Sequence, residues 1–479
     1  MTERASSAEP WLGRAACLVG GEWRIPDGPA LPVIDPYTEQ PIGETAEAGP
    51  VLTAEAVSRA AAAYPAWERT SPADRADLLD RLADSLEARA GELAALITRE
   101  MGMPAALATA SQGELPPRVL RAFATSARAF AWTEKIDGAQ LHRIPLGVVA
   151  AITPWNMPAH QIIAKVGAAL AAGNTVVLKP SEATPFDANL IAAAALEAGF
   201  PPGVLNVVHG TGPATGQALV TDPRVGHVSF TGSVPAGQTV AALAAGHTAS
   251  TTLELGGKSA AVLLPDADLA HAVGAAVKSG LVNSGQACNA TTRIVVPRSA
   301  LADVGDLVLD ALDTVVAGDP RDPATTFGPL ASARQRDRVR HLLDTAGDDR
   351  AVTPRLALLP ARGYFLEPRV YFGLDARHPL VRQEVFGPVL VVQSYADETD
   401  ATDVANDSDF GLSAEVWSAD PDRAEAFART LRVGQVKING VRTRERPGVP
   451  FGGFKASGYG RELGAEGIAA LTAVQAVLR

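Results

Sequence analysis

The middle of the chain alternates apolar runs with segments of helical spacing. Five runs that favour strands lie between residues 146 and 255, and LGVVAAIT is apolar throughout except for its last residue. Strands that alternate with helices of about 8–15 residues are typical of βαβ units in a parallel sheet. We therefore predict a doubly wound, Rossmann-like α/β sheet, which binds ligands at the carboxyl ends of its strands. The runs and the helices expected between them are, in order, LGVVAAIT, 158–172, TVVLKP, 185–199, VLNVV, 213–220, HVSF, 234–245 and TTLEL.

The segment before this sheet follows other patterns. Residues 17–45 are rich in Gly and Pro and contain short β-type runs, which predicts edge hairpins. From Ser71 to Ile97 leucines recur at helical spacing, with Ser71 as the expected N-cap and Pro72 as the first helical residue. A second helical block at about 115–134 precedes the polar stretch KIDGAQLHR, which predicts a further hairpin.

After Gly256 the alternation of strands and helices resumes with longer connections, which predicts a second α/β domain. Helices are expected at about 267–282 and 300–316, with RIVVP between them as a strand and another strand after PLVRQEVFGP. The Gly-rich run at 447–464 predicts a long loop, and the final LTAVQAVLR predicts a strand that leaves the globule.

The composition is that of an ordinary soluble globular protein. Hydrophobic residues make up 47% of the 479 residues and charged residues 20%, so two or three domains with buried cores are expected. The net charge of −11 and the lack of a basic run argue against a nucleic-acid partner. Two cysteines cannot form a disulfide framework, and no apolar run suits a signal peptide or a membrane span, so we expect a cytoplasmic location.

Cys288 is the first candidate for chemistry. It lies in LVNSGQACNATTR among small residues, which let a substrate and backbone N–H donors approach it closely. The thiolate is the nucleophilic form and a free thiol has a pKa of about 8.5, so the site must also favour the anion or accept its proton. The alternative is an inert, buried small hydrophobe.

Two strand-to-helix turns are candidates for binding a dinucleotide. In GTGPATG, residues 210–216, glycines let the backbone approach a pyrophosphate, and a helix N-terminus offers unpaired N–H groups. FTGSVPAG, residues 230–237, repeats the arrangement with Ser233 at a helix start. Each turn alone is also compatible with a plain tight turn, but two of them on one sheet edge favour a dinucleotide.

KPSE, residues 179–182, ends a strand on the same edge. Lys179 and Glu182 suit the donation and acceptance of hydrogen bonds at ribose hydroxyls, and a carboxylate there repels a 2′-phosphate. NAD is therefore favoured over NADP, although a surface ion pair is the alternative for these two side chains.

Asn156 and Glu254 are candidates for the remaining steps of catalysis. Asn156 lies between two prolines in TPWNMP, where a rigid amide suits an oxyanion donor, and an ordinary helix cap is the alternative. Glu254 ends the apolar strand TTLEL, where desolvation raises the pKa of a carboxyl toward that of a general base, and a paired structural carboxylate is the alternative.

Other catalytic motifs are missing from the sequence. It contains no HExxH, CxxC or GxSxG, and its eight histidines are scattered, so we expect neither a metal site nor a serine hydrolase. GGKS at 256–259 fails as a P-loop because Thr252 stands where that motif requires glycine.

Taken in order, TPWNMP, KPSE, FTGS, LELGGKS, NSGQAC, EVFGPV and PFGGFKASGYGRE resemble the aldehyde dehydrogenase superfamily from about Gly20 to the C-terminus. The resemblance implies Cys288 as nucleophile, Glu254 as general base and Asn156, with the Cys288 N–H, as oxyanion hole. It implies Lys165 and Glu462 as a proton relay. NAD contacts are implied for Thr153, Trp155, Lys179, Glu182, Gly212, Gly216, Phe230, Thr231, Gly232, Ser233, Leu255, Glu384 and Phe386.

The resemblance also implies a domain plan and a substrate tunnel. The expected substrate is a small-molecule aldehyde in a roomy tunnel that tolerates polar or bulky groups, and the expected assembly is a homodimer or homotetramer. The tunnel positions are Met157, Ala164, Asn289, Glu445 and Phe451. The domains are 1–122 with 146–255 for the dinucleotide, 256–456 for catalysis, and 123–145 with 457–479 for oligomerisation.

Three rival functions remain open at this point. A CoA-acylating dehydrogenase transfers the acyl group to CoA and generally lacks the glutamate base, so Glu254 argues against it. A cysteine esterase uses the same oxyanion hole without NAD. A protein that kept the fold and lost turnover is the third alternative.

Overall fold

The first sheet grows in both directions from its central strand, β7. In the computed structural model, which describes residues 13–347, 350–355, 359–441 and 446–479, the strand order is β2-β1-β9-β8-β7-β10-β11-β21. The five strands from β9 to β11 are parallel, as predicted. The strands are β1 (Cys17–Val19), β2 (Glu22–Arg24), β7 (Val148–Ile152), β8 (Thr175–Lys179), β9 (Leu205–Val207), β10 (Val225–Thr231), β11 (Ser250–Glu254) and β21 (Gly458–Tyr459).

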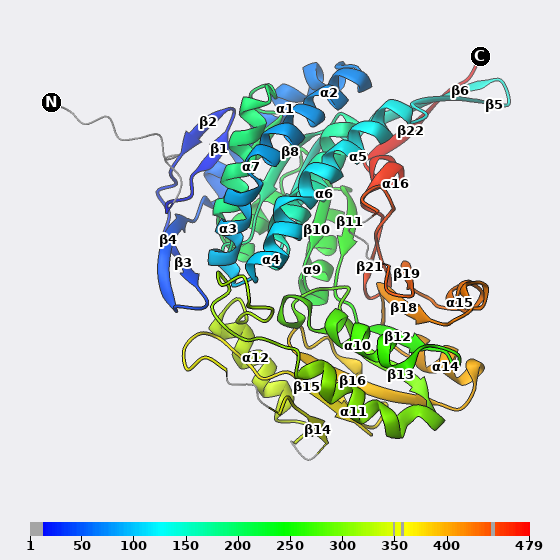
Figure 1. Ribbon diagram of the computed structural model, residues 1–479. Helices are drawn as coiled ribbons and strands as arrows, with labels where there is room; N and C mark the ends of the chain where they lie inside the picture. Colours follow the sequence, from blue (N-terminus) through cyan, green and yellow to red (C-terminus); the bar gives the residue numbers. More distant parts are fainter. Residues whose placement is uncertain (1–12, 348–349, 356–358, 442–445) are drawn as a thin grey trace.

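Helices cover both faces of this sheet because its strands are apolar on both faces (Figure 1). Val149 and Ala151 of β7 face α2, α3, α5, α6 and α7, whereas Val148 and Ala150 face α1, α8 and α9. The helices are α1 (Gly49–Glu68), α2 (Pro72–Ala88), α3 (Ala90–Met101), α4 (Ala105–Ala108), α5 (Leu115–Ala129), α6 (Pro158–Ala172), α7 (Phe186–Glu197), α8 (Gln217–Val220), α9 (Val234–Ala245) and α16 (Gly464–Ala469).

The strand order creates a ligand crevice beside β7. Since β8 and β10 lie on opposite sides of β7, the connections that follow β7 and β10 diverge at the carboxyl edge of the sheet. Open α/β sheets bind ligands at such a switch point. The segment 153–157 leaves β7 there, and Gly232 and Ser233 leave β10 there.

The second sheet begins immediately after the first ends. β11 closes with Glu254, and the next strand starts at Ser259 in a sheet ordered β14-β15-β16-β13-β12-β18-β19. Its strands are β12 (Ser259–Leu263), β13 (Thr291–Pro297), β14 (Ala351–Val352), β15 (Arg369–Phe372), β16 (Val389–Tyr395), β18 (Ser413–Trp417) and β19 (Gln435–Ile438). Its helices are α10 (Leu269–Gly280), α11 (Leu301–Leu312), α12 (Ala333–Leu343), α13 (Pro379–Arg382), α14 (Glu398–Asn406) and α15 (Pro421–Ala428).

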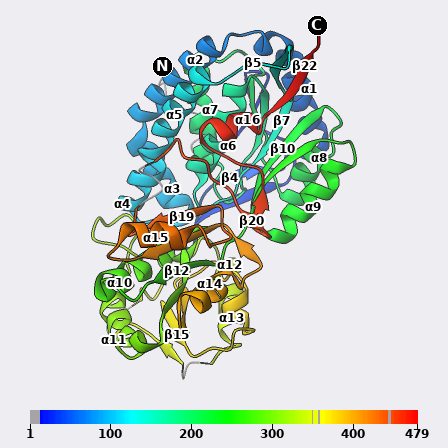
Figure 2. The ribbon, with the colours of Figure 1, turned by 90° about the vertical axis from the view of Figure 1, so that its right-hand side faces the viewer.

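A third, three-stranded sheet protrudes near the C-terminus, away from the two large sheets and their helices (Figures 1 and 2). It joins the predicted hairpin, β5 (Thr133–Ile136) and β6 (Ala139–Pro145), to the last strand, β22 (Thr472–Val477). Two smaller antiparallel pairs complete the strands: β3 (Ala30–Asp35) with β4 (Gln40–Ala46), and β17 (Phe410–Gly411) with β20 (Phe454–Lys455).

Several predicted elements differ from those observed. The helix expected at 213–220 is a π-helix, η2 (Gly212–Gly216), followed by the short α8. The helix expected at 267–282 ends at Gly280 and continues as the 3-10 turn η3 (Val282–Gly285). Helix α1 was not predicted because its alanine-rich sequence gives little contrast between buried and exposed faces. Within the described ranges, no helix has both the length and the apolar character that a bilayer crossing requires.

Candidate active site

The loop that carries Cys288 has an unusual backbone. Asn283, Ser284 and Gly285 all have positive φ, of 51°, 57° and 78°. Such strain in non-glycine residues persists only where the surroundings fix it. Ser284 Oγ donates to Gly328 O at 2.7 Å, and Gln286 Oε1 accepts from Ala331 N at 2.9 Å, which fixes the loop against the following segment.

Asn156 is bound to the same loop on two sides. Its side-chain Nδ2 donates to the backbone carbonyl oxygen of Gln286 at 2.9 Å, and its backbone carbonyl oxygen accepts from Asn283 Nδ2 at 3.0 Å. The residue is 5% exposed and lies before α6, whose N-cap is Met157 without a side-chain cap bond. The helix-cap alternative for Asn156 is therefore wrong, and the amide has a second N–H available toward the cavity.

In the described part of the chain, no positively charged side chain is among the main influences on the pKa of the Cys288 thiol. The thiol is half-buried, and loss of water contact, followed by the charges of Glu384 and Glu254, raises its pKa to about 12. The backbone N–H groups of Asn289 and Cys288 point toward the sulfur and oppose this rise. Of the two alternatives expected from the sequence, the described residues do not favour the anion, so activation requires a group that accepts the thiol proton or the arrival of positive charge.

Glu254 is a buried carboxyl group without a hydrogen-bond partner among the described residues. It is 2% exposed, and neither carboxyl oxygen is bonded. Burial raises its pKa well above the ordinary value, and the negative charge of Glu462 raises it further, against the opposing charges of Lys165 and Arg461. The alternative of a paired structural carboxylate is not supported by these contacts.

Lys165 and Glu462 form a buried ion pair beside Glu254. Their side chains are 0% and 5% exposed, and Ser229 Oγ lies 3.4 Å from each of them. A backbone bridge of two 2.8 Å hydrogen bonds ties Glu462 to Phe451. The two residues proposed as a relay are thus brought together, and their charges act on the pKa of Glu254 in opposite directions.

A cavity of about 710 Å³ opens onto the thiol. Asn156, Cys288 and Glu462 line it together with four of the five expected tunnel residues, Met157, Ala164, Asn289 and Phe451. Glu445, the fifth, lies outside the described residues. Glu254 does not line the cavity; its Oε1 lies beside Gly452, where a Cβ atom would be 2.8 Å from it, and Gly452 follows the cavity residue Phe451 in the chain.

The carboxyl end of β10 leads into the N-terminus of α9. Ser233 is the N-cap, is exposed, and makes no side-chain cap bond, so its hydroxyl and the first helical N–H groups remain free among the described contacts. The ring of Phe230 lies under Gly232, where a Cβ atom would be 2.6 Å from it. Thr231 Oγ1 donates to Gln161 Oε1 at 3.3 Å, and Leu255 packs against the first turns of the helix at Gly237.

Lys179 and Glu182 are close, as the sequence suggested. Lys179 Nζ lies 3.7 Å from Glu182 Oε2, and the lysine side chain is 3% exposed whereas that of Glu182 is 48% exposed. Burial lowers the pKa of Lys179, against the charges of Glu182 and Glu47. The backbone N–H of Thr153 donates to Lys179 O at 3.2 Å and joins this group to the β7 end.

The turn GTGPATG does not offer the free N–H groups that we predicted. Glu47 accepts hydrogen bonds from the backbone N–H groups of Thr211 and Thr215, at 3.0 and 3.2 Å, and from both hydroxyls. The carboxylate therefore occupies the anion site within the protein itself, and nothing in the sequence around Glu47 signals this. Gly216 lies beside the aliphatic part of the Lys179 side chain, and a Cβ atom added at Gly212 would meet no described atom outside its own turn within 4 Å.

Glu384 and Phe386 lie on a loop that α12 fixes. Arg338 Nη2 donates to Glu384 O at 2.9 Å, and Gln335 Nε2 donates to Phe386 O at 2.7 Å. Phe386 has a φ of 56°, and its ring packs edge to face with Trp155, with ring centroids 5.5 Å apart. Glu384 Oε1 accepts from Gly257 N at 2.9 Å, and burial raises the pKa of Glu384 to about 7.

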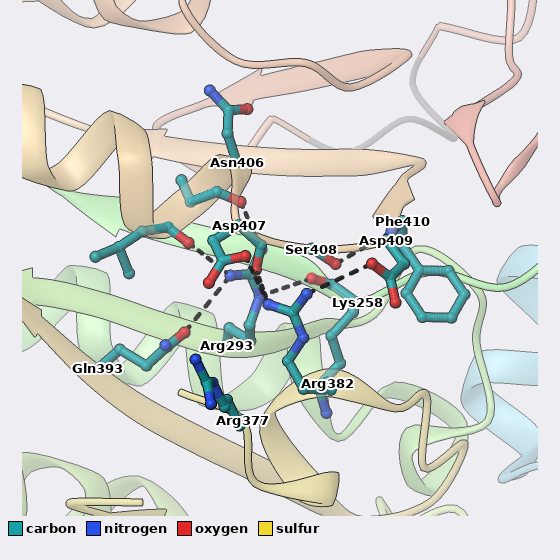
Figure 3. A network of polar contacts seen from close by, with 12 residues as sticks. Lys258, Arg293, Arg377, Arg382, Gln393, Asn406, Asp407, Ser408, Asp409 and Phe410 are labelled. Atoms are coloured by element: carbon teal, nitrogen blue, oxygen red, sulfur yellow. Dashed lines mark hydrogen bonds and ion pairs between the residues drawn. The ribbon is translucent and has the colours of Figure 1, made fainter. Parts of the chain in front are cut away.

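Two buried cations, Lys258 and Arg293, lie close together at the second sheet (Figure 3). Arg293 donates to the carbonyl oxygens of Lys258, Val404 and Ala405 at 2.7 to 2.9 Å, which caps the C-terminal turn of α14. The ammonium of Lys258 has no hydrogen-bond partner in the described part of the chain, and burial lowers its pKa to about 7. Its charge opposes the rise in the pKa of Glu384.

Comparisons with known proteins identify the family and the fold of this chain. The model of the aldehyde dehydrogenase family matches residues 23–477. A 3-succinoylsemialdehyde-pyridine dehydrogenase from a Pseudomonas species is 40% identical, covering 96% of this chain and 97% of its own. Geranial dehydrogenase from Castellaniella defragrans is 39% identical, covering 95% and 96%. The structure of an aldehyde dehydrogenase C variant from Pseudomonas syringae with NAD+ and octanal has a TM-score of 0.95 at 37% identity, covering 99% and 98%.

Proposed function

Because this chain belongs to the aldehyde dehydrogenase family, we propose that Cys288 is its nucleophile, Asn156 its oxyanion donor and Glu254 its general base. The reaction is the NAD-dependent oxidation of an aldehyde to the carboxylic acid. The observation that carries the three assignments is that Asn156 and Cys288 line one cavity, while Glu254 is buried beside Gly452, the residue that follows the cavity residue Phe451.

In the first step the Cys288 thiol gives its proton to water, the resulting thiolate adds to the aldehyde carbon, and the carbonyl oxygen becomes an oxyanion. The second N–H of the Asn156 amide and the backbone N–H of Cys288 donate to this oxyanion. Donors of this kind are worth about 3–4 kcal/mol in other enzymes, because they are already oriented when charge develops. The hydrogen bond from Asn156 to Gln286 O provides that orientation here.

The residues at the carboxyl edge of the first sheet fit NAD. Ser233 and the start of α9 suit the pyrophosphate, Lys179 with Glu182 suits the adenosine ribose, and Glu384 suits the nicotinamide ribose. The resemblance assigns further NAD contacts, and Phe386, from the loop before β16, packs against Trp155. These positions are Thr153, Trp155, Gly212, Gly216, Phe230, Thr231, Gly232, Leu255 and Phe386. When bound, NAD accepts the hydride that the aldehyde carbon loses.

The thioester that remains on Cys288 is hydrolysed by water. Glu254, as carboxylate, takes a proton from that water, and the hydroxide adds to the thioester carbon. The C–S bond then breaks, the sulfur takes the proton of the acid, and the product leaves as carboxylate. The proton on Glu254 passes toward Lys165 and Glu462, whose ion pair lies beside Glu254. Since Glu254 does not line the cavity, its side chain must rotate toward the thioester for this step.

The rival functions fit the chain less well. The relatives support oxidation with NAD and support neither transfer to CoA nor hydrolysis of esters without NAD. A fold without turnover does not account for an unpartnered buried carboxyl at Glu254 beside a half-buried thiol at Cys288.

The substrate, assembly and compartment are further parts of this proposal. The size of the cavity and the octanal bound to the Pseudomonas syringae relative support an aldehyde of about eight carbons or a bulkier one. Val474 and Val477 of β22 are 53% and 36% exposed, which supports association into a homodimer or homotetramer through the third sheet. Two free cysteines support the cytoplasm. We retain the domain division given by the sequence, with its junction at residues 255 and 256.

Replacement of Cys288 tests the central assignment. Cys288→Ala removes the nucleophile, so NADH production from an aldehyde panel should fall at least 1,000-fold, on the order of losses at other nucleophiles, while NAD still binds. Cys17→Ala is the matched control, because Cys17 is fully buried in the first sheet and its replacement should not affect turnover. Turnover that survives Cys288→Ala contradicts the assignment.

A further inference from the structure

One part of the cavity wall combines apolar side chains with three polar residues. Leu115, Val119, Met157 and Phe451 contribute apolar side chains, and Ala164 leaves space on the same face of α6 as His160, one turn earlier. Ser111, Gln112 and His160 supply polar atoms to this part of the wall. The wall therefore suits a long apolar body that carries a single polar group.

The π-helix η1 (Thr109–Gly113) places two of these polar residues. Gln112 Nε2 donates to Ser111 Oγ at 3.2 Å and to Met157 Sδ at 3.1 Å, and Gln112 Oε1 accepts from the backbone N–H of His160 at 3.2 Å. Ser111 Oγ donates to Leu107 O at 2.6 Å. The polar atoms of Ser111 and Gln112 are thus used within the protein, and they hold the backbone of His160 and the Met157 side chain in place.

The imidazole of His160 differs, because neither ring nitrogen has a protein partner in the described part of the chain. Nδ1 is buried from solvent and has no partner among the described residues. Nε2 is not buried in this way, and His160 lines the cavity. Burial lowers the pKa of His160 to about 4, so the ring is neutral at physiological pH. A proton on Nε2 faces the cavity and finds a partner there, whereas a proton on Nδ1 stays unpaired.

We propose that the Nε2–H of His160 is a specificity-determining donor, and that the preferred aldehydes carry an uncharged hydrogen-bond acceptor on a mostly apolar body. A keto group, an ether oxygen or an aromatic ring nitrogen fits this description. A carboxylate fits less well, because Glu462 lines the same cavity and its charge acts on His160. This proposal rests on the proposed use of the cavity as the aldehyde channel.

Substrates that differ only in the acceptor test the proposal. Octanal is compared with a series of oxo-octanals in which the keto group moves from carbon 4 to carbon 7, and kcat/KM is measured from NADH absorbance. The wild-type enzyme should prefer at least one oxo isomer over octanal. In His160→Leu the ratio of kcat/KM for that isomer over octanal should fall about tenfold, the size expected for one uncharged hydrogen bond.

Two further variants separate recognition from a general disturbance. His160→Gln retains an N–H donor of similar reach and should recover most of the wild-type ratio. His341→Leu, on the exposed end of α12, should keep the ratio unchanged. Equal losses on all substrates in His160→Leu, or no wild-type preference for any oxo isomer, overturn the proposal about His160. Failure of the wild-type enzyme to form NADH from any aldehyde overturns the proposed function instead, and the His160 assignment with it.

Discussion

The backbone of Gly257 lies directly against the carbonyl oxygen of Cys288, and a Cβ atom at residue 257 would overlap that oxygen. Gly256 has the same relation to a carboxylate oxygen of Glu384. These two glycines follow Glu254 by two and three residues. One short turn after β11 therefore positions the proposed base, a proposed cofactor carboxylate and the nucleophile relative to one another.

Alanine at these two glycines should impair different parameters. Gly257→Ala must displace the Cys288 backbone and should lower kcat about tenfold or more, because a small misplacement of a nucleophile has costs of this order. Gly256→Ala should mainly raise the KM for NAD, since Glu384 must move. Gly305→Ala, on α11 with open space around it, is the control and should stabilise the protein by about 0.5–1 kcal/mol through helix propensity. Identical effects of the first two variants on kcat and KM would argue against this division.

Alkylation of Cys288 should be slow without NAD and should increase steeply with pH. Its pKa of about 12 leaves little thiolate at pH 7, so the rate with iodoacetamide should rise about tenfold per pH unit up to pH 10. Cys17, whose pKa is also about 12 and whose side chain is sealed, should stay unlabelled in the same experiment. A rate that levels off near pH 8.5 would show an ordinary thiol and contradict the prediction.

Glu254→Gln should separate oxidation from hydrolysis. The amide cannot accept a proton from water, so a single turnover of NADH should form while steady-state turnover falls about 100-fold, within the usual range for a lost general base. Rapid-mixing absorbance measurements resolve the two phases. Normal steady-state turnover in this variant would remove Glu254 from its assigned role.

Affinity for NAD should improve as pH rises through about 7. Burial raises the pKa of Glu384 to about 7, so its carboxylate, the form that only accepts hydrogen bonds from ribose hydroxyls, predominates above that value. Titration calorimetry at pH 6 and pH 8 should show tighter binding at pH 8. In Glu384→Gln the difference between the two pH values should disappear, and a persistent difference would assign the pH dependence to another group.

Breaking the Lys165–Glu462 pair should cost more stability than removing it. Glu462→Gln leaves the Lys165 ammonium buried without its partner, and loss of one member of a buried pair typically costs about 3–5 kcal/mol. The double variant Lys165→Met/Glu462→Gln should be less destabilised than the sum of the single variants Lys165→Met and Glu462→Gln, because no unpaired charge remains. Urea denaturation of the two single variants and the double variant measures this, and strict additivity would contradict the argument.

The sequence by itself determined the parallel core and indicated the residues that we propose as chemically reactive. Apolar runs such as LGVVAAIT become β7 and its neighbours because a strand buried on both faces must be apolar throughout, which is a local pattern. The helix at Pro158–Ala172 and the N-cap at Ser71 were likewise set by local signals, a proline start, a glycine end and a capping side chain.

Only the tertiary structure decided which polar groups are free and which are already paired. Glu47 comes from a distant strand end to occupy the GTGPATG turn, and Gln112 reaches His160 from a separate helix, so no local pattern contains either contact. The pKa of Cys288 also depends on Glu384, almost one hundred positions away in the chain. Hydrogen bonding and desolvation act through space, and they depend on neighbours that the fold brings together from anywhere in the sequence.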